Sequence, residues 1–493
     1  MVIRPRAAPV GPGGYRTACA APAIQLRFDP NGMVTTCCKT IQPLGHITTQ
    51  RLRDIWEGER RRQVVAALEH GDFSVGCQQC GAEIRQEGRD VSYAAIHDAW
   101  AGHLTDADAA TVWPVRMELN LSNACNLQCI QCDGESSSAI RLHREGRPAL
   151  PKVYGDAFFE DLEAFLPHLE RMVFAGGEPF LGSENFRIWD LIADQAPHID
   201  CMVVTNATQR TPRIERLLER LRFSFVFSID GVTADTYERI RLGSDFDQVM
   251  DNVAWFTRYA RERGTTASVN HCLMPQNAHE FGDLLRWAEQ QDLFVNVSVV
   301  RHPASASIAA LPPAEIQRIH ELFEAAHPQV VEDLVLNRAT WERERERIAS
   351  WAAGSVAATG SEVQTVLWFR CAGDRPYDAD GARSELQAYA ADGRVHEFTV
   401  GPDDLLTSAD AGFAPSGGEL VGRSVRELTN AVSDAFGNMD FYEVTATSDD
   451  RVDARAVFGR HPARITTVAC RDRSGWADEA RLLIAFGEPG SPP

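Results

Sequence analysis

Between residues 113 and 326, short apolar runs alternate regularly with longer amphipathic segments. The apolar runs are strand candidates at 113–121, 171–177, 199–206, 223–230, 266–274 and 293–300. The amphipathic segments are helix candidates at 158–169, 184–195, 212–221, 246–263, 280–291 and 313–326. Such alternation is typical of parallel strands with helices packed outside them. Six units fall short of a closed eight-unit barrel, so the sequence predicts an α/β fold built on a partial (β/α)6 barrel.

The segments on either side of this barrel are organised differently. Residues 1–100 hold two short strand candidates, an arginine-rich helix near 51–69 and a pair of cysteines. So small a core is rarely stable alone, which predicts a cluster-binding domain held together by metal. Residues 327–363 predict a helical linker. Residues 364–486 predict strands around one helix, an α+β accessory domain with a loose resemblance to PAS-type sensor domains.

Length and charge narrow the classes of function. A chain of 493 residues predicts two to four domains. Asp and Glu outnumber Lys and Arg by 69 to 49, for a net charge of −20, which argues against a nucleic-acid partner because phosphates need a basic face. We find no run of 18 apolar residues and no apolar signal segment, so we expect no membrane partner and a cytoplasmic location.

The cysteines are concentrated at one end of the chain. Because disulfides are rare in a reducing cytosol, crowded thiols predict metal or iron–sulfur ligands. Four of the 12 cysteines are scattered singly and predict small buried side chains, namely Cys201, Cys272, Cys371 and Cys470. Eight lie within the first 132 residues, namely Cys19, Cys37, Cys38, Cys77, Cys80, Cys125, Cys129 and Cys132.

Three of these cysteines follow the first predicted strand on one short loop. Their spacing is Cys125-x3-Cys129-x2-Cys132. Three thiolates can bind three irons of a [4Fe–4S] cube and leave the fourth iron open to a substrate or cofactor. The loop lies at the C-terminal end of its strand, where parallel α/β folds place their chemistry.

Together with the GGEP motif at residues 176–179, after the second strand, this loop resembles the radical SAM superfamily over roughly residues 113–310. The resemblance implies that the open iron binds the amino and carboxylate groups of S-adenosylmethionine (SAM). An electron donor such as flavodoxin or ferredoxin then drives its cleavage to methionine and a 5′-deoxyadenosyl radical, which abstracts a hydrogen atom. One departure is Gln131, where many members carry an aromatic residue, so adenine packing would fall to Ile130 or the sixth strand.

The same resemblance implies SAM-binding residues at the ends of the other strands. Glu178 would hold the SAM ammonium, Ser228 and Asn270 would contact its ribose and carboxylate, and Arg241 would steer the carboxylate. The alternative for these polar residues is capping of a neighbouring helix, and for Arg241 a surface position. The complete set is Gly176, Gly177, Glu178, Thr205, Ser228, Asp230, Asn270 and Arg241.

Two residues are candidates for the substrate side. Strand alternation turns Glu118 and Asn120 toward the barrel cavity and Met117 toward the helices. A polar cavity floor suits a hydroxylated or amide-rich substrate, and Glu118 is its catalytic candidate. Cys272 could return a hydrogen atom to a substrate radical, as in some radical SAM epimerases; the alternative is core packing.

The N-terminal cysteines resemble the SPASM/twitch auxiliary-cluster domain, which implies an auxiliary [4Fe–4S] cluster. The implied ligands are Cys19, Cys37, Cys77 and Cys80, with Cys38 as competitor to Cys37. In the family this domain usually follows the barrel, whereas here it precedes it, and we expect it over the barrel mouth. The alternative is a zinc knuckle with four thiolate ligands.

Together these features predict an oxygen-sensitive radical SAM enzyme that acts on a natural-product-type substrate: a sugar, a cyclitol or a peptide. The fate of the substrate radical stays open among oxidation, epimerisation, dehydration and cross-linking. One alternative is a maturase of ribosomal peptides. Another, of a different class, is a non-enzymatic zinc- or cluster-binding regulator, which would cleave no SAM.

Overall fold

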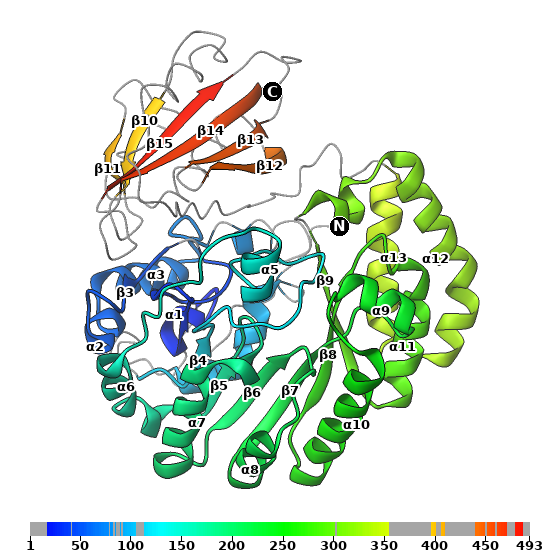
Figure 1. Ribbon diagram of the computed structural model, residues 1–493, viewed down its shortest axis with the longest axis horizontal. Coiled ribbons are helices and arrows are strands. Elements are labelled where there is room, and N and C mark those ends of the chain that lie inside the picture. Colours follow the sequence, from blue (N-terminus) through cyan, green and yellow to red (C-terminus); the bar gives the residue numbers. More distant parts are fainter. Residues whose placement is uncertain are drawn as a thin grey trace.

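The structure analysed is a computed structural model (Figure 1). It describes residues 17–353, apart from 41, 78, 82–83, 85–88, 90–91, 105–112 and 301–302, together with the backbone of a separate sheet within residues 396–486. No helix within these ranges is long and apolar enough to cross a membrane.

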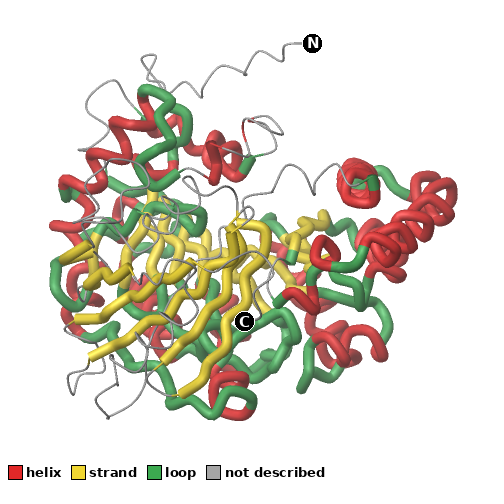
Figure 2. Tube along the Cα trace, turned by 90° about the horizontal axis from the view of Figure 1, so that it is seen from above, coloured by secondary structure: helices red, strands yellow, loops and turns green. Residues whose placement is uncertain are grey.

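The predicted strands form one parallel run in sequence order, which confirms the α/β fold class (Figure 1). Figure 2 shows the strands and helices of the chain from above. Each strand is slightly shorter than its apolar run. The strands are β4 (Arg116–Leu119), β5 (Arg171–Phe174), β6 (Asp200–Thr205), β7 (Arg222–Ser228), β8 (Ala267–Leu273) and β9 (Phe294–Val299).

Helices lie along the outer face of this curved sheet (Figure 1). Those predicted are α6 (Asp156–Glu163), α7 (Ser183–Gln195), α8 (Pro212–Arg220), α10 (Phe246–Arg263), α11 (Phe281–Gln290) and α12 (Pro313–Asp333). Further helices are α5 (Ser138–His143), α9 (Ala234–Ile240) and α13 (Arg338–Ala352). Short 3-10 turns are η4 (Leu166–His168), η5 (Pro179–Leu181), η6 (Ala278–Glu280), η7 (Ala304–Ala306) and η8 (Ile308–Ala310).

The core lies between the sheet and these helices. On β7, Phe223, Phe225 and Phe227 alternate toward the helices and are buried. The Phe225 ring packs on Phe256 of α10, with the centroids 4.8 Å apart. Burying such rings removes large apolar surfaces from water, which is the main force that holds helix and sheet together.

The N-terminal segment extends the barrel sheet. Strand β1 pairs in parallel with β4, with Arg27 opposite Glu118, and a nine-stranded sheet results. Instead of covering the barrel mouth, as expected, these strands lie at the side of the barrel. The elements are α1 (Ala21–Ile24), β1 (Gln25–Phe28), β2 (Met33–Thr35), β3 (Gly45–His46), α2 (Leu52–Trp56), α3 (Glu59–Glu69) and η3 (Tyr93–His103).

At the opposite end of the parallel run, side chains cover the outer strand. The Asn337 side chain accepts from the Val295 N–H of β9 at 2.8 Å and donates to the Leu293 carbonyl at 3.0 Å. The Thr340 hydroxyl donates to the Val295 carbonyl at 3.2 Å. The segment predicted as a linker therefore includes α13, which packs on the barrel.

The C-terminal strands form a six-stranded antiparallel sheet of order β11-β10-β15-β14-β13-β12. The predicted helix at 423–436 lies outside the described residues, and the resemblance to PAS domains is not confirmed. The strands are β10 (His396–Val400), β11 (Leu406–Ala409), β12 (Met439–Ser448), β13 (Arg451–Phe458), β14 (His461–Cys470) and β15 (Glu479–Phe486).

Candidate cluster and cofactor sites

The loop that carries Cys125, Cys129 and Cys132 connects β4 to α5 and is fastened by that helix. The Ser137 hydroxyl caps α5 and also donates to the Leu127 carbonyl at 2.6 Å. The Ser138 hydroxyl accepts from the Cys125 N–H at 3.1 Å. Hydrogen bonds from both hydroxyls fix the loop where β4 ends.

The GGE segment packs directly on this loop. Gly176 and Gly177 have φ of +79° and +54°, and a Cβ on Gly177 would lie 2.3 Å from the Ala124 carbonyl oxygen. The Glu178 N–H donates to that carbonyl at 2.7 Å. The glycines therefore allow the backbones of two loops to meet, which adds a structural reason for them besides the predicted approach to SAM.

Glu178 is buried and receives hydrogen bonds from two loops. The Thr205 hydroxyl lies 2.9 Å from each carboxylate oxygen, and the backbone N–H groups of Asn206 and Phe180 donate at 2.8 and 3.1 Å. Burial raises the pKa of Glu178 to about 7, and these donors oppose the rise. Both oxygens are occupied by the chain's own donors, so its predicted contact with the SAM ammonium stays a prediction.

Asp230 organises the other side of the loop. It is fully buried, and its Oδ2 lies 2.7 Å from both Arg241 Nη2 and Gln131 Nε2. Its Oδ1 accepts from the Cys272 N–H at 2.7 Å. Arg241 is therefore a buried partner of Asp230, not a surface residue, and Gln131 reaches the same carboxylate from the position where an aromatic residue is usual.

Two side chains from outside the loop, one after α9 and one after β6, reach the thiols. Arg241 Nη1 lies 3.9 Å from Cys129 Sγ, and Asn206 Nδ2 lies 3.9 Å from Cys125 Sγ. The neighbouring Cys132 thiol, with the Arg241 charge, lowers the pKa of Cys129 to about 7. The sequence analysis did not single out Asn206 as a site residue, although it directly follows Thr205.

The remaining candidates lie on neighbouring strands of the barrel interior. Ser228 is opposite Asn270 in the β7–β8 register, and Asn270 Oδ1 accepts from the Ser298 hydroxyl at 3.2 Å. Cys272 packs against a small apolar cluster that includes Ile240 and Met274, and burial raises the pKa of its thiol to about 12. These contacts fit the core-packing alternative for Cys272, and its role as hydrogen donor stays a prediction.

Glu118 is buried on β4 and pairs with Arg27, and its role on the cavity floor stays a prediction. Arg27 Nε lies 3.1 Å from Glu118 Oε1 across the β1–β4 ladder. Sequence reasoning missed this partner because the two residues are 91 positions apart.

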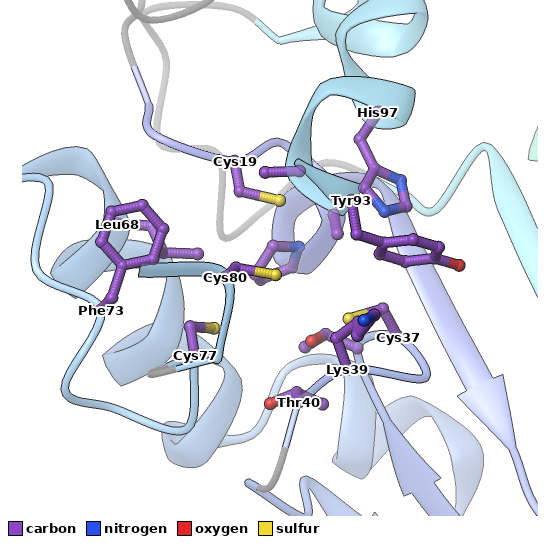
Figure 3. Close-up of a pocket in the computed structure, with 14 residues that line it drawn as sticks. Cys19, Cys37, Lys39, Thr40, Leu68, Phe73, Cys77, Cys80, Tyr93 and His97 are labelled. Atoms are coloured by element: carbon purple, nitrogen blue, oxygen red, sulfur yellow. The ribbon is translucent and has the colours of Figure 1, made fainter. Parts of the chain in front are cut away.

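The four N-terminal thiols line one cavity (Figure 3). Cys19 precedes β1, Cys37 follows β2, and Cys77 and Cys80 come from the segment after α3. Cys38 is exposed and does not line the cavity, which supports Cys37 as the ligand. Burial raises the pKa of Cys19 to about 12 and also raises the pKa of Cys37 and Cys77, so these three thiols need a bound metal to become thiolates.

Across the ranges that the structure describes, no three His, Cys, Asp or Glu side chains meet closely enough to hold a single metal ion. The four thiols instead surround a space. A donor set of one thiolate for each iron fits a cubane cluster.

Two family models match the chain in these regions. The radical SAM superfamily model matches residues 119–288, and the SPASM model, described as an iron–sulfur cluster-binding domain, matches residues 19–81. The first match covers β4 to α11, and the second covers all four thiols of the N-terminal cavity.

Curated relatives match parts of the chain. A GTP 3′,8-cyclase of Listeria monocytogenes serovar 1/2a is 24% identical over 195 residues, which cover 38% of this chain and 56% of that protein. An AdoMet-dependent heme synthase of Methanosarcina barkeri is 27% identical over 147 residues, covering 28% of this chain and 36% of that protein. The chain thus spans about half the length of the first of these relatives, and less of the second.

Two solved structures match parts of this chain. Native anSMEcpe with bound AdoMet has a TM-score of 0.33 at 17% identity, covering 44% of this chain and 62% of that chain. Streptococcus suis SuiB bound to precursor peptide SuiA has a TM-score of 0.34 at 14% identity, covering 64% and 71%.

The barrel and its three-thiol loop thus define a radical SAM domain. A SPASM domain, described as an iron–sulfur cluster-binding domain, precedes this radical SAM domain in the chain. These domains imply a [4Fe–4S] cluster, SAM and auxiliary iron–sulfur binding. The match to the radical SAM model does not support the alternative of a non-enzymatic regulator.

Proposed function

We propose that the chain cleaves SAM reductively at the Cys125–Cys132 loop and uses the resulting radical to abstract a hydrogen atom from a polar substrate inside the barrel. The observation that carries this proposal is the loop itself, which offers three thiols and is tied to the strand ends beside it. When bound there, the cluster supplies the electron that divides SAM into methionine and a 5′-deoxyadenosyl radical.

Residues around the loop would position SAM. Glu178 fastens the GGE segment to the end of β6, and Asp230 holds Arg241 and Gln131 beside the thiols. Gln131 Oε1 and Arg241 Nε are buried and have no hydrogen-bond partner in the described part of the chain. One is an acceptor and the other a donor, so both can serve a polar ligand.

The substrate side is also polar. Asn120 Oδ1, on the strand-end segment after Glu118, is buried without a partner among the residues that the structure describes. A substrate with hydroxyl or amino donors would satisfy such an amide oxygen, which supports the sugar and cyclitol classes over an apolar substrate. A peptide stays the alternative, and the likeness to GTP 3′,8-cyclases adds GTP to the compounds worth testing.

The test is anaerobic SAM cleavage by the reconstituted full chain with dithionite, measured as 5′-deoxyadenosine. We expect turnover in the parent and none after Cys125, Cys129 and Cys132 are changed together to Ala. The matched control is Cys201→Ala, because Cys201 is a buried thiol of β6 outside both clusters of cysteines. SAM cleavage that survives the triple change would refute the assignment of the loop.

Deuterated compounds would then identify the substrate class. A cyclitol, a sugar nucleotide, a short peptide and GTP are each supplied with deuterium on carbon. The true class transfers deuterium into 5′-deoxyadenosine, and the others do not. Transfer from the peptide alone would overturn the preference for a sugar or cyclitol.

A further inference from the structure

One residue of the N-terminal cavity has no assigned role. His97, on η3, lines this cavity together with the four thiols. Its side chain is 1% exposed, and neither ring nitrogen has a hydrogen-bond partner among the residues that the structure describes. Figure 3 shows the imidazole beside Tyr93, on the side of the cavity that also carries Cys37.

A buried imidazole without hydrogen-bond partners lowers the stability of the folded chain. A neutral ring carries one N–H donor and one acceptor, and a buried polar group without a partner costs about 1–3 kcal/mol. Packing holds the ring in place instead, since it meets the Tyr93 ring edge-on with centroids 5.6 Å apart. The ring is therefore fixed, and its nitrogens are available to whatever fills the cavity.

We propose that His97 donates its N–H to a sulfur of the auxiliary cluster held by Cys19, Cys37, Cys77 and Cys80, and thereby raises the reduction potential of that cluster. This inference rests on the presence of that cluster in the cavity. Four thiolates already supply one ligand to each iron, so the imidazole is not required as a ligand. The cluster sulfurs would supply acceptors within the cavity, and a hydrogen bond to them would favour the more negative, reduced state.

Burial and the nearby Arg116 charge keep the ring neutral, since they lower the pKa of His97 to about 3. A neutral ring still has an N–H to donate. His97 is thus a positioning and tuning residue, distinct from the catalytic groups of the barrel.

The experiment isolates the auxiliary cluster in the full chain. Cys125, Cys129 and Cys132 are changed to Ala in every sample, so that after anaerobic reconstitution only the N-terminal cavity holds iron. In this background His97→Leu removes the donor and His97→Gln keeps an N–H. Leu68→Met is the matched control, because Leu68 lines the same cavity and offers no hydrogen bond. Iron content and an EPR-monitored redox titration are measured for each.

We expect about four irons per chain in all samples. At a fixed applied potential, the reduced fraction should fall several-fold in His97→Leu, recover in His97→Gln and stay unchanged in Leu68→Met. An unchanged titration in His97→Leu would overturn the proposal. Loss of iron in both His97 variants but not in Leu68→Met would make His97 a ligand, against the proposal. Zinc without iron in the triple-Ala chain that keeps His97 would also overturn the proposal, because the cavity would then hold no iron–sulfur cluster.

Discussion

At the residue scale, the barrel site depends on one buried ion pair. Asp230 and Arg241 are both buried, and the pair also anchors Gln131 and the Cys272 backbone. Removing one charge from such a pair leaves the other unsolvated, whereas removing both is far less costly. The pair therefore couples the folding of the barrel to the placement of Arg241 beside Cys129.

We predict that Arg241→Met lowers the free energy of unfolding by about 3–5 kcal/mol, because it leaves the buried Asp230 carboxylate without its charged partner. Asp230→Asn combined with Arg241→Met should recover a large part of this loss. Urea unfolding of the four proteins in this cycle measures the coupling. If the two changes are simply additive, the pair does not stabilise the barrel.

A second prediction concerns pH. Folding raises the pKa of Glu178 from its ordinary value of 4.5 to about 7, so between these values the folded chain holds a proton that the unfolded chain has lost. Stability therefore falls as pH rises from about 4.5 to 7, by about 3 kcal/mol from this group. Glu178→Gln should remove that part of the pH dependence.

Glu280 is the control for this titration. Hydrogen bonds from the Thr233 and Thr236 hydroxyls and the Val232 N–H lower its pKa, so its contribution is lost as pH falls through the acidic range. Glu280→Gln should alter only the acid limb of the stability profile. Equal pH profiles for Glu178→Gln and the parent would show that folding does not shift the pKa of Glu178.

At the element scale, the covering of β9 by α13 depends on Asn337. Besides its contacts with the Val295 N–H of β9 and with the Leu293 carbonyl just before that strand, Asn337 Nδ2 donates to Glu289 Oε2 at 3.2 Å. We predict that Asn337→Ala lowers the free energy of unfolding by about 2–3 kcal/mol, because buried groups of β9 lose their partners. Chemical denaturation measures this, with the exposed Val335→Ala as control; equal losses would contradict the prediction.

The sequence predicted these elements well where the pattern is local. All six strands, and the predicted helix after each of them, appear near their predicted bounds because hydrophobic period and length identify them. The parallel pairing of β1 with β4 could not be predicted, since the Arg27–Glu118 register joins segments 91 residues apart. The same limit applies to the covering of β9.

The candidate site was predictable to a similar extent. Cysteine spacing predicted both groups of thiols, and the positions of the strand ends indicated Glu178, Thr205 and Asp230. His97 carried no such signal, because a lone histidine in an apolar turn is usually part of the core. Only its burial and missing partners distinguish it.

At the scale of the whole molecule, the nine-stranded sheet leaves little of the barrel edge uncovered. Deleting residues 1–104 would expose the unpaired backbone of β4, which is a template for pairing with another chain. We predict that this truncation self-associates, as measured by size-exclusion chromatography with light scattering. Deleting residues 364–493 leaves both ends of the parallel run covered, and that chain should elute without aggregates. A monodisperse N-terminal truncation would contradict this view of the sheet.

Because β1 pairs with β4, the SPASM domain can lie beside the barrel whether it comes before or after the barrel in the chain. The SPASM domain is attached through a strand pairing between segments that are distant in sequence, so the same neighbour could be supplied from either end of a gene. A circular permutation that moves this domain behind the barrel would need only a connection long enough to return to the β4 side. The unusual order of the two domains is thus a difference in how the gene is assembled, and the placement of the cluster cavity beside the barrel does not depend on it.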